Sequence, residues 1–420
     1  MKIAIFGLGY VGLTAAACLT SQGHWVFGVD ISEQKVRETN AGRSPIVEPG
    51  LQELLSKGAQ SKLLYCATDC GEKLNECDMA IVCVGTPSAP DGSHNMGHIA
   101  EVTRQIAGAL NTKREQPLTV VYRSTMRPGS IEELILPIFS TILGDELSAV
   151  EIVYNPEFLR EATAIHDYFN PPKIVIGTVD GQPNKRMDEL NAGLNAPVFY
   201  TRYRESEITK FVDNTFHALK VAFANELGRV CIQLGISAQK MHEIFISDTK
   251  LNISPYYLRP GGAFGGSCLP KDVRALQYMA TDVGANTTLI DMLLRSNDAH
   301  KHFLFEHVIR DLKPGGSVLM LGLAFKRYSD DLRESPKVDM ARKFLNAGYK
   351  LSVYDPSVQP NLLIGQNLGY SFLHLPSLSR LLVSEQTIAE SAYDLVVDMS
   401  GMAKDLKFKT DRFVDLNALD

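Results

Sequence analysis

The sequence lacks an excess of positive charge and, beyond its N-terminus, any long apolar run. A membrane-spanning helix needs about 20 consecutive apolar residues. Residues 2–19 are apolar like a short secretory signal, but they contain a glycine pattern that explains them better, and no comparable run follows. The formal net charge of the 420 residues is −6. This excludes a general binder of nucleic acid or of membrane surfaces, so any anionic ligand must meet a local group of basic side chains.

Cysteine pairs of the CxxC type are also missing. The seven cysteines stand at positions 18, 66, 70, 77, 83, 231 and 268, and the spacing of the four between 66 and 83 does not fit a zinc site. A chain of this length needs no disulfide framework to fold. We therefore expect reduced thiols, a cytoplasmic protein and no metal site.

The first 30 residues carry the pattern of a dinucleotide-binding unit. Residues 2–6 predict a buried strand, residues 11–22 a helix, and residues 25–29 a second strand that ends at Asp30. The sequence Gly-x-Gly-x-x-Gly lies at the turn between the first strand and the helix. An acidic residue follows the glycines by about 20 residues, as in proteins that bind NAD.

Each glycine of this pattern has a distinct structural role. Gly7 permits the tight turn, Gly9 lets the backbone approach a pyrophosphate, and Gly12 lets the helix pack closely on the strand. The helix N-terminus then faces the phosphates. Asp30 can accept a hydrogen bond from a ribose 2′-hydroxyl and would repel a 2′-phosphate. No arginine follows it directly, so the sequence predicts NAD as the cofactor rather than NADP.

Three further apolar segments, residues 79–85, 118–125 and 150–155, predict strands that end in small or polar residues. In a doubly wound sheet, ligands bind at the carboxyl ends of the strands. Thr86 and Thr125 are therefore candidate cofactor contacts, with ordinary turn residues as the alternative.

Residues 201–233 contain no proline and predict one long helix. At 100° per residue, apolar side chains that include Phe211 and Phe223 share one side. The opposite sector holds Lys210, Asn214, His217 and Asn225. A solvated face is the simple alternative, but such faces are usually rich in Glu, Lys and Arg, and Asn is a mediocre helix former. We therefore expect this polar stripe to line a cavity.

A second α/β pattern occupies the C-terminal part of the chain. Residues 317–325, 350–356 and 394–400 predict strands, with a helix over residues 338–348, but no second Gly-x-Gly-x-x-Gly occurs. The whole pattern predicts an α/β fold with two Rossmann-like doubly wound domains, joined by a long central helix and a small helical domain. The expected divisions are residues 1–200, 201–310 and 311–420.

Cys268 differs from the other six cysteines in its surroundings. Pro270 suits the first turn of a helix, which places Cys268 just outside a helix N-terminus. The helix dipole and the cation of Lys271 both favour the thiolate. A buried thiol remains the alternative.

A thiolate beside a nicotinamide favours a four-electron oxidation. An alcohol that loses a hydride becomes an aldehyde, and a thiolate can add to that aldehyde to give a thiohemiacetal. A second hydride transfer gives a thioester, which water releases as an acid. A plain alcohol dehydrogenation has no use for the sulfur.

Several motifs of the chain resemble those of one family. In order they read GLGYVGL, VGTPS, RSTMRPG, NPEFLREATAIHDY, the helix with Lys210 and Asn214, FGGSCLPKD, and FKxxxDDLRESP. This set is similar to the UDP-glucose/GDP-mannose dehydrogenase family over nearly the whole chain. The resemblance implies NAD-dependent four-electron oxidation of the C6 alcohol of a nucleotide sugar. It also implies a homodimer formed through the long helix.

The resemblance implies roles for individual residues. Cys268 would be the nucleophile, and Lys210 and Asn214 would stabilise the oxygen at C6. Asp272 and Glu157 would position or activate water, with Thr125 nearby. The implied NAD contacts are Gly7, Gly9, Tyr10, Val11, Gly12, Asp30, Lys35, Thr86, Thr125, Lys271 and Arg333. The implied substrate contacts are Glu161, Lys210, Asn214, His217, Asn225, Tyr256, Tyr257, Arg259, Pro260, Gly262 and Lys326.

Within the family, the sequence favours GDP-mannose as the substrate. The segments SPIVEPGL (44–51), HALKVAFANE (217–226) and KLNISPYYLRPG (250–261) are most like the GDP-mannose branch, whereas residues 164–177 lean toward the UDP-glucose pattern. Gly262-Ala263 stands where the family often has an aromatic residue, and Ser329 stands in place of the usual Thr. A UDP-sugar therefore remains the alternative substrate.

Two other functions are compatible with parts of the pattern. A two-electron hydroxyacid dehydrogenase of the 6-phosphogluconate type would share the first domain and the Lys–Asn helix, but would leave Cys268 without a task. A non-catalytic NAD sensor would bind the cofactor without turnover.

The hypothesis of an activated thiolate predicts fast alkylation at Cys268. Iodoacetamide at neutral pH should label this thiol faster than exposed control thiols, because the thiolate is the reactive form. Mass mapping of the labelled peptides measures the rates. Labelling at position 268 that is no faster than at the controls would contradict the hypothesis.

Overall fold

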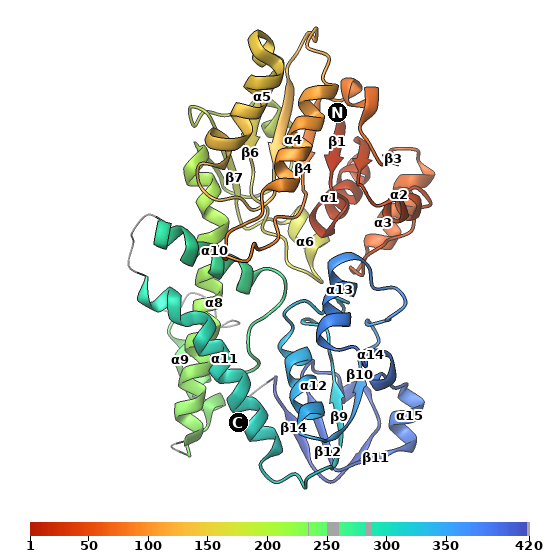
Figure 1. Ribbon diagram of the computed structural model, residues 1–420, viewed down its shortest axis with the longest axis vertical. Helices are drawn as coiled ribbons and strands as arrows, with labels where there is room; N and C mark the ends of the chain where they lie inside the picture. Colours follow the sequence, from red (N-terminus) through yellow and green to blue (C-terminus); the bar gives the residue numbers. More distant parts are fainter. Residues whose placement is uncertain (234, 250–259, 283–286, 418–420) are drawn as a thin grey trace. The chain divides into compact units, whose positions relative to one another are not determined.

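A computed structural model describes residues 1–233, 235–249, 260–282 and 287–417. The chain divides into two compact units, Met1–Val212 and Asp213–Asp420 (Figure 1). The predicted substrate contacts Tyr256, Tyr257 and Arg259 lie outside the described residues.

The first unit is built on a sheet of eight strands. These are β1 (Lys2–Phe6), β2 (Trp25–Val29), β3 (Leu64–Ala67), β4 (Met79–Val82), β5 (Leu118–Tyr122), β6 (Val150–Tyr154), β7 (Ile174–Thr178) and β8 (Val198–Arg202). Their order in the sheet is β3-β2-β1-β4-β5-β6-β7-β8. The first six positions follow the doubly wound order of dinucleotide-binding folds. All neighbours are parallel except β6 and β7, which pair antiparallel.

Helices cover both faces of this sheet. One face carries α1 (Tyr10–Ser21), α3 (Leu51–Gln60), α6 (Ala164–Phe169) and α7 (Lys185–Leu190), and the other carries α4 (Gly97–Ala109) and α5 (Leu136–Leu143). Figure 1 shows α1 beside α3 and α4 beside α5. Alternate residues of β1 divide between the two cores, because successive side chains of a strand point to opposite faces. Ile3 and Ile5 join the first core, and Ala4 and Phe6 join the second.

The long helix predicted over residues 201–233 is α8 (Tyr203–Gln233). On its apolar side Phe211 is fully buried, whereas Phe223 is 48 % exposed. The predicted side of this 31-residue helix groups the apolar residues, but a fixed rotation per residue does not tell which turns other elements cover. In the polar sector Lys210 and Asn225 are buried, so this face is not a solvated one.

The second unit contains helices followed by a smaller parallel sheet. The helices α9 (Ala238–Ser247), α10 (Leu269–Asp282) and α11 (Thr288–Ile309) come first. Then follow β9 (Ser317–Leu321), α12 (Pro336–Asn346), β10 (Lys350–Tyr354), α13 (Gly365–His374), α14 (Leu378–Leu381), α15 (Glu385–Glu390), β12 (Leu395–Asp398) and β14 (Phe413–Asp415). The sheet order is β10-β9-β12-β14. Val318 and Met320 of β9 pack toward α11 and α12, and Leu319 and Leu321 pack on the other face.

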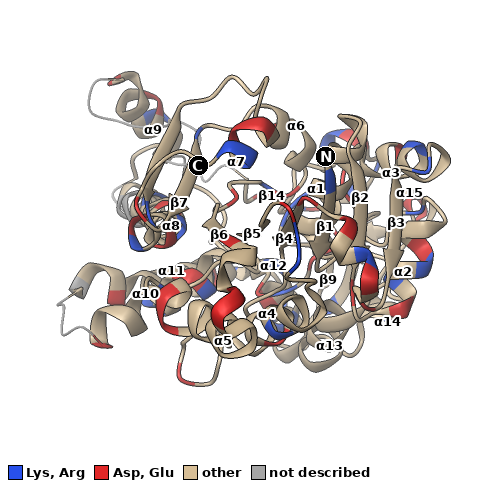
Figure 2. Ribbon diagram, turned by 90° about the horizontal axis from the view of Figure 1, so that it is seen from above, with Lys and Arg blue, Asp and Glu red and all other residues tan. Residues whose placement is uncertain are grey.

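The architecture confirms the predicted α/β class with two doubly wound sheets and a long helix. Acidic and basic residues alternate along the chain, as in α2 (Glu33–Asn40) in Figure 2. None of the described helices is long and apolar enough to cross a membrane. No group of three or more His, Cys, Asp and Glu side chains suited to a metal ion occurs among the described residues.

A buried lysine at the start of α12 lies near the carboxyl ends of the strands of the C-terminal sheet. Lys337 is 8 % exposed, and its Nζ donates to Ser400 Oγ at 2.5 Å. Burial lowers the pKa of Lys337 to about 8, and the carboxylates of Asp355 and Asp398 raise it only in part. The ordinary value is 10.5, so the folded state binds this proton less tightly than the unfolded chain does.

We expect Lys337→Met to raise the melting temperature at pH 7. Below the folded pKa of about 8, the buried amine is protonated, and this lowers the free energy of unfolding. The loss disappears as the pH rises from 8 toward the unfolded pKa of 10.5. The gain in unfolding free energy should be about 1–3 kcal/mol at pH 7, because an apolar side chain of similar length avoids the desolvation cost. Thermal unfolding at pH 7 and pH 10 measures it. A difference between variant and parent that does not shrink at pH 10 would contradict this explanation.

Candidate active site

The glycine turn has the geometry of a dinucleotide-binding loop. Gly7 has a φ of +93°, which only glycine adopts without strain. A Cβ added at Gly12 would lie 1.9 Å from the Gly7 carbonyl oxygen, so close packing of α1 on β1 requires glycine there. A Cβ added at Gly9 would meet no atom within 4 Å. The open space at Gly9, at the N-terminus of α1, fits the pyrophosphate of NAD.

Asp30 follows β2 and is 8 % exposed. Its carboxylate accepts hydrogen bonds from the backbone N–H of Leu8 at 2.7 Å and of Ser32 at 2.9 Å. Lys35 Nζ lies 3.3 Å from the same carboxylate. The carboxylate therefore lies beside the glycine turn, as its predicted role on a ribose requires.

The loops after β4 and β5 are joined to each other. Thr86 Oγ1 donates to the carbonyl oxygen of Thr125 at 2.8 Å, and Ser124 Oγ donates to that of Val84 at 2.7 Å. Thr86 is 4 % exposed. Both predicted cofactor contacts thus lie together at the carboxyl edge of the first sheet.

Glu157 and Lys210 form an ion pair within the first unit. Glu157 follows β6, and Lys210 lies on α8. The ammonium lies 2.9 Å from Glu157 Oε1 and also donates to the Glu157 carbonyl oxygen at 2.8 Å. The two side chains are 12 % and 9 % exposed. The structure therefore brings together two residues that are 53 positions apart in the sequence, both in predicted catalytic roles.

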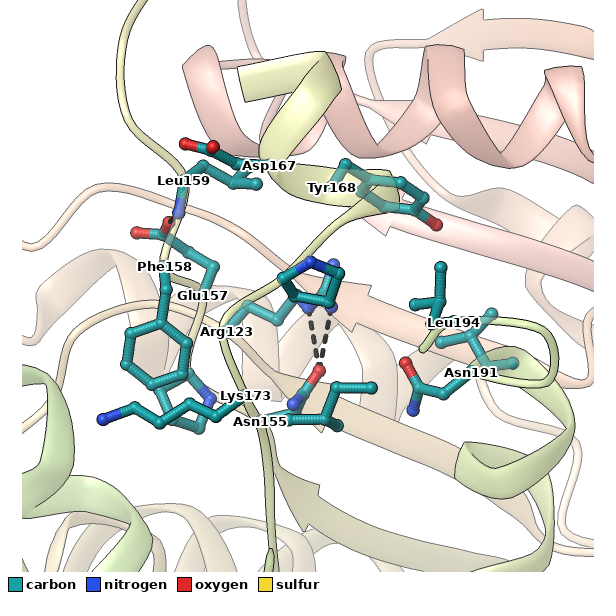
Figure 3. A pocket seen from close by; sticks show the side chains of 14 residues that line it. Arg123, Asn155, Glu157, Phe158, Leu159, Asp167, Tyr168, Lys173, Asn191 and Leu194 are labelled. Atoms are coloured by element: carbon teal, nitrogen blue, oxygen red, sulfur yellow. Dashed lines mark hydrogen bonds between the residues drawn. The ribbon is translucent and has the colours of Figure 1, made fainter. Parts of the chain in front are cut away.

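A cavity of about 40 Å³ has Glu157 among its lining residues (Figure 3). Arg123 points into it and donates from Nε and Nη2 to Asn155 Oδ1 at 3.1 and 2.9 Å. Lys173 and Phe158 also line the cavity, and the Lys173 ammonium lies over the Phe158 ring, 4.8 Å from its centroid. This volume holds a few water molecules at most, so the cavity is too small for a nucleotide sugar.

Cys268 lies where the sequence predicts, immediately before α10. Its carbonyl oxygen accepts the N–H of Asp272 at 2.9 Å, so it occupies the cap position of the helix. Cys268 is exposed, whereas the other six cysteines are buried. Burial raises the pKa of Cys18, Cys66, Cys77 and Cys83 to about 12, which makes those thiols poor nucleophiles.

Asp272 and Asn214 form a hydrogen bond within the second unit. The Asn214 side-chain amide donates to Asp272 Oδ2, and Asp272 is 1 % exposed. Lys271 Nζ lies 3.4 Å from Asp272 Oδ1. The cation expected beside the thiol is therefore paired with this carboxylate.

Buried amides hold the loop that leads to Cys268. Asn225 Oδ1 accepts the N–H of Gly261 at 3.0 Å, and its Nδ2 donates to the Gly262 carbonyl oxygen at 3.4 Å. Asn297 makes a matching pair with the backbone N–H and carbonyl of Phe264, at 2.9 and 2.8 Å. Asn297 was not predicted. Its signal was an Asn inside a helix, the same signal that identified Asn214 and Asn225.

The glycines before Cys268 allow close packing on the loop after β9. A Cβ at Gly265 would lie 2.3 Å from the Glu334 carbonyl oxygen, and one at Gly266 would lie 2.7 Å from the Phe325 ring. The structure shows that both approach the segment FKRYSDDLRESP, which contains Lys326 and Arg333. Arg333 pairs with Asp331 at 2.6 Å.

The remaining predicted contacts have these places. Val11 lies on the first turn of α1, and Glu161 lies between β6 and α6. His217 is half-buried on α8, and Pro260 is buried. A Cβ added at Gly228 would lie 2.8 Å from Pro260, so this proline packs directly on the helix.

Sequence reasoning missed the role of Glu48. Its carboxylate accepts a hydrogen bond from the Tyr10 hydroxyl at 2.5 Å and from the backbone N–H of Ala162 and Ala164 at 2.8 and 2.9 Å. Glu48 is 7 % exposed. It therefore ties the glycine turn to the segment after Glu157. Ala162 has a φ of +68°, a left-handed conformation that costs a residue with a Cβ about 1 kcal/mol.

Comparison with known proteins agrees with this geometry. Three models of the UDP-glucose/GDP-mannose dehydrogenase family match: the NAD binding domain over residues 1–195, the central domain over residues 204–299, and the UDP binding domain over residues 319–399. The chain is 41 % identical to GDP-mannose 6-dehydrogenase of Pseudomonas aeruginosa, over 94 % of this chain and 91 % of that protein. It is 33 % identical to a UDP-glucose 6-dehydrogenase of Bacillus subtilis, over 85 % and 80 % of the two chains.

Solved structures show the same family. A UDP-glucose dehydrogenase from Pyrobaculum islandicum superposes with a TM-score of 0.87 at 30 % identity, covering 100 % of this chain and 94 % of the other. The ternary complex of GDP-mannose dehydrogenase from P. aeruginosa gives a TM-score of 0.58 at 38 % identity, with 99 % and 96 % coverage. The chain therefore belongs to the UDP-glucose/GDP-mannose dehydrogenase family and is an NAD-dependent nucleotide-sugar dehydrogenase.

Proposed function

We propose that the protein oxidises the C6 alcohol of a nucleotide sugar to the acid through a thioester on Cys268, with GDP-mannose as the substrate. The observation that carries this proposal is the single exposed thiol of the described cysteines, placed at the N-terminus of α10. One turn further on, Asp272 accepts a hydrogen bond from Asn214. A two-electron dehydrogenase would have no use for an exposed thiol in this place.

The reaction balances as two oxidations and one hydrolysis. The alcohol loses a hydride and a proton to give an aldehyde, and the Cys268 thiolate adds to its carbonyl carbon. The thiohemiacetal loses a second hydride to give the thioester. Water then attacks the thioester carbon, the carbon–sulfur bond breaks, and the sulfur leaves as the thiolate. Bound NAD supplies the hydride acceptor, one molecule for each oxidation.

The residues of the chain have distinct tasks in this proposal. The Lys210 ammonium and the Asn214 amide stabilise negative charge on the oxygen at C6, as oxyanion-hole donors do. Glu157, held by Lys210, and Asp272, held by Asn214, orient the water for hydrolysis and accept its proton. Thr125 and Thr86 contact the cofactor beside the glycine turn.

The nucleotide sugar is assigned from the relatives and from the segments described above. GDP-mannose is favoured because the relatives at 41 % identity that cover most of the chain are GDP-mannose 6-dehydrogenases. A UDP-sugar is the second candidate, since the structure at a TM-score of 0.87 is a UDP-glucose dehydrogenase. Lys326, in the segment on which the Cys268 loop packs, and the predicted contacts outside the described residues would bind the nucleotide.

The proposal extends to assembly and location. We propose a homodimer formed through α8, where Phe216 and Phe223 are 38 % and 48 % exposed on one stripe. Light scattering measures the mass of the particle, and a monomer would contradict the dimer. We also propose that the chain divides by function into residues 1–200, 201–310 and 311–420. A cytoplasmic location is proposed as well, because the seven thiols are free.

We expect two molecules of NADH per molecule of GDP-mannose consumed. NADH absorbance at the end point, divided by the sugar nucleotide lost, measures this ratio. Cys268→Ala should lower kcat by about a thousandfold or more, because the covalent step disappears. Cys70→Ala, which removes a buried thiol, is the matched control and should keep the parent ratio. One NADH per sugar together with a fully active Cys268→Ala variant would indicate a two-electron dehydrogenase.

A substrate panel separates the reaction type from the sugar. The panel contains GDP-mannose, UDP-glucose, UDP-GlcNAc and UDP-ManNAc, each with NAD. Turnover of UDP-glucose without turnover of GDP-mannose would overturn the substrate assignment and leave the mechanism in place.

A further inference from the structure

A buried carboxylate lies on α8 one turn before Lys210. Glu207 is fully buried, and its two oxygens accept backbone hydrogen bonds from Gly129 at 2.6 Å and Ile131 at 2.9 Å. Gly129 has a φ of +91°, and Ile131 begins η2 (Ile131–Ile135). The carboxylate therefore holds the end of the loop that follows β5.

This loop is also held at its other end. Residues 123–130 leave β5 through Ser124 and Thr125, which bond to the loop after β4 through Val84 and Thr86. A loop fixed at both ends keeps the Thr125 backbone in one place. Without Glu207, the backbone N–H groups of Gly129 and Ile131 would be buried without this acceptor. Burying an unsatisfied donor lowers the stability of the folded loop.

Glu207 and Lys210 brace neighbouring loops from one helix. Lys210 holds the loop after β6 through Glu157, and Glu207 holds the loop after β5. The two strands are adjacent and parallel in the sheet, and all these residues belong to the first unit. The start of α8 therefore fixes the relative positions of the predicted water-orienting residue and the predicted cofactor contact.

We propose that Glu207 is a positioning residue for the reaction, whose carboxylate holds the Thr125 loop in its cofactor-binding conformation. This rests on the proposed cofactor role of Thr86 and Thr125. Glu207 makes no proposed contact with NAD or substrate, and it acts only through the backbone of the loop.

Because the charge of Glu207 changes with pH, its positioning role should appear in the pH dependence of NAD binding. Burial raises its pKa to about 7, while the two backbone N–H groups act in the opposite direction. Among the charged neighbours, Glu132 of η2 raises this pKa and Arg204 of α8 lowers it. The ionised carboxylate can accept from both loop N–H groups, and the protonated acid binds one of them well. The loop is therefore held best above about pH 7.

The experiment compares Glu207→Gln with Glu205→Gln in the full-length chain. The first change imitates the protonated acid, and the second makes the same change on an exposed position of the same helix. We expect Glu207→Gln to weaken NAD binding about tenfold, the loss of roughly one charge-assisted hydrogen bond. Amide hydrogen exchange of residues 124–131 should become faster. Glu205→Gln should change neither quantity.

The pH profile gives a second readout. The Kd for NAD of the parent protein, measured by calorimetry, should rise as the pH falls through about 7, and this step should be absent in Glu207→Gln. If Glu207→Gln fails to fold by circular dichroism, Glu207→Asp replaces it. The shorter carboxylate should give a smaller loss of NAD affinity with the pH step retained.

The outcomes are distinct. Unchanged exchange at residues 124–131 would overturn the proposal, and so would faster exchange with an unchanged Kd for NAD, which would indicate a purely structural role. Failure of the parent protein to oxidise any nucleotide sugar would refute the proposed reaction. It would leave the binding and exchange measurements on Glu207 valid.

Discussion

Hydrogen bonds from backbone N–H groups to buried carboxylates hold the loops at the carboxyl edges of both sheets. Each such carboxylate accepts from at least two backbone donors. They are Asp30 from Leu8 and Ser32, Glu48 from Ala162 and Ala164, Glu207 from Gly129 and Ile131, Asp355 from Leu323, Ala324 and Ser357, and Asp398 from Ser400 and Ala403. Loops at these edges must leave backbone and side chains available to ligands, so they cannot be held by strand pairing. A buried acceptor with two oxygens meets this need, because it satisfies two donors without covering the loop.

The same constraint explains why the groups with proposed catalytic roles are paired. Glu157 is held by Lys210 in the first unit, and Asp272 is held by Asn214 in the second. A carboxylate that must orient water at a low-dielectric site needs a fixed direction and a partner for its charge. Each unit thus supplies one carboxylate with its own partner from α8, and the long helix is the element that both pairs share.

The sequence predicted the parts that depend on local pattern. The glycine turn, the strand ending at Asp30, α8 and the helix after Cys268 follow from periodicity and from the special conformations of glycine and proline. The strands β7 and β8 were not predicted, and β7 pairs antiparallel to β6, which no local pattern reveals. The buried places of Glu48, Glu207 and Lys337 could not be predicted either, because each depends on backbone groups distant in the sequence.

Six of the seven thiols are buried, and burial raises the pKa of five of them. A mild oxidant such as hydrogen peroxide attacks thiolates first, so its damage would concentrate on Cys268. With Cys268 as the proposed nucleophile, peroxide would then stop turnover while the fold stayed intact, and a reductant that reverses a sulfenic acid would restore it. Because one sulfur is exposed and six are buried, that one sulfur is the point at which the redox state of the surroundings would act on the protein.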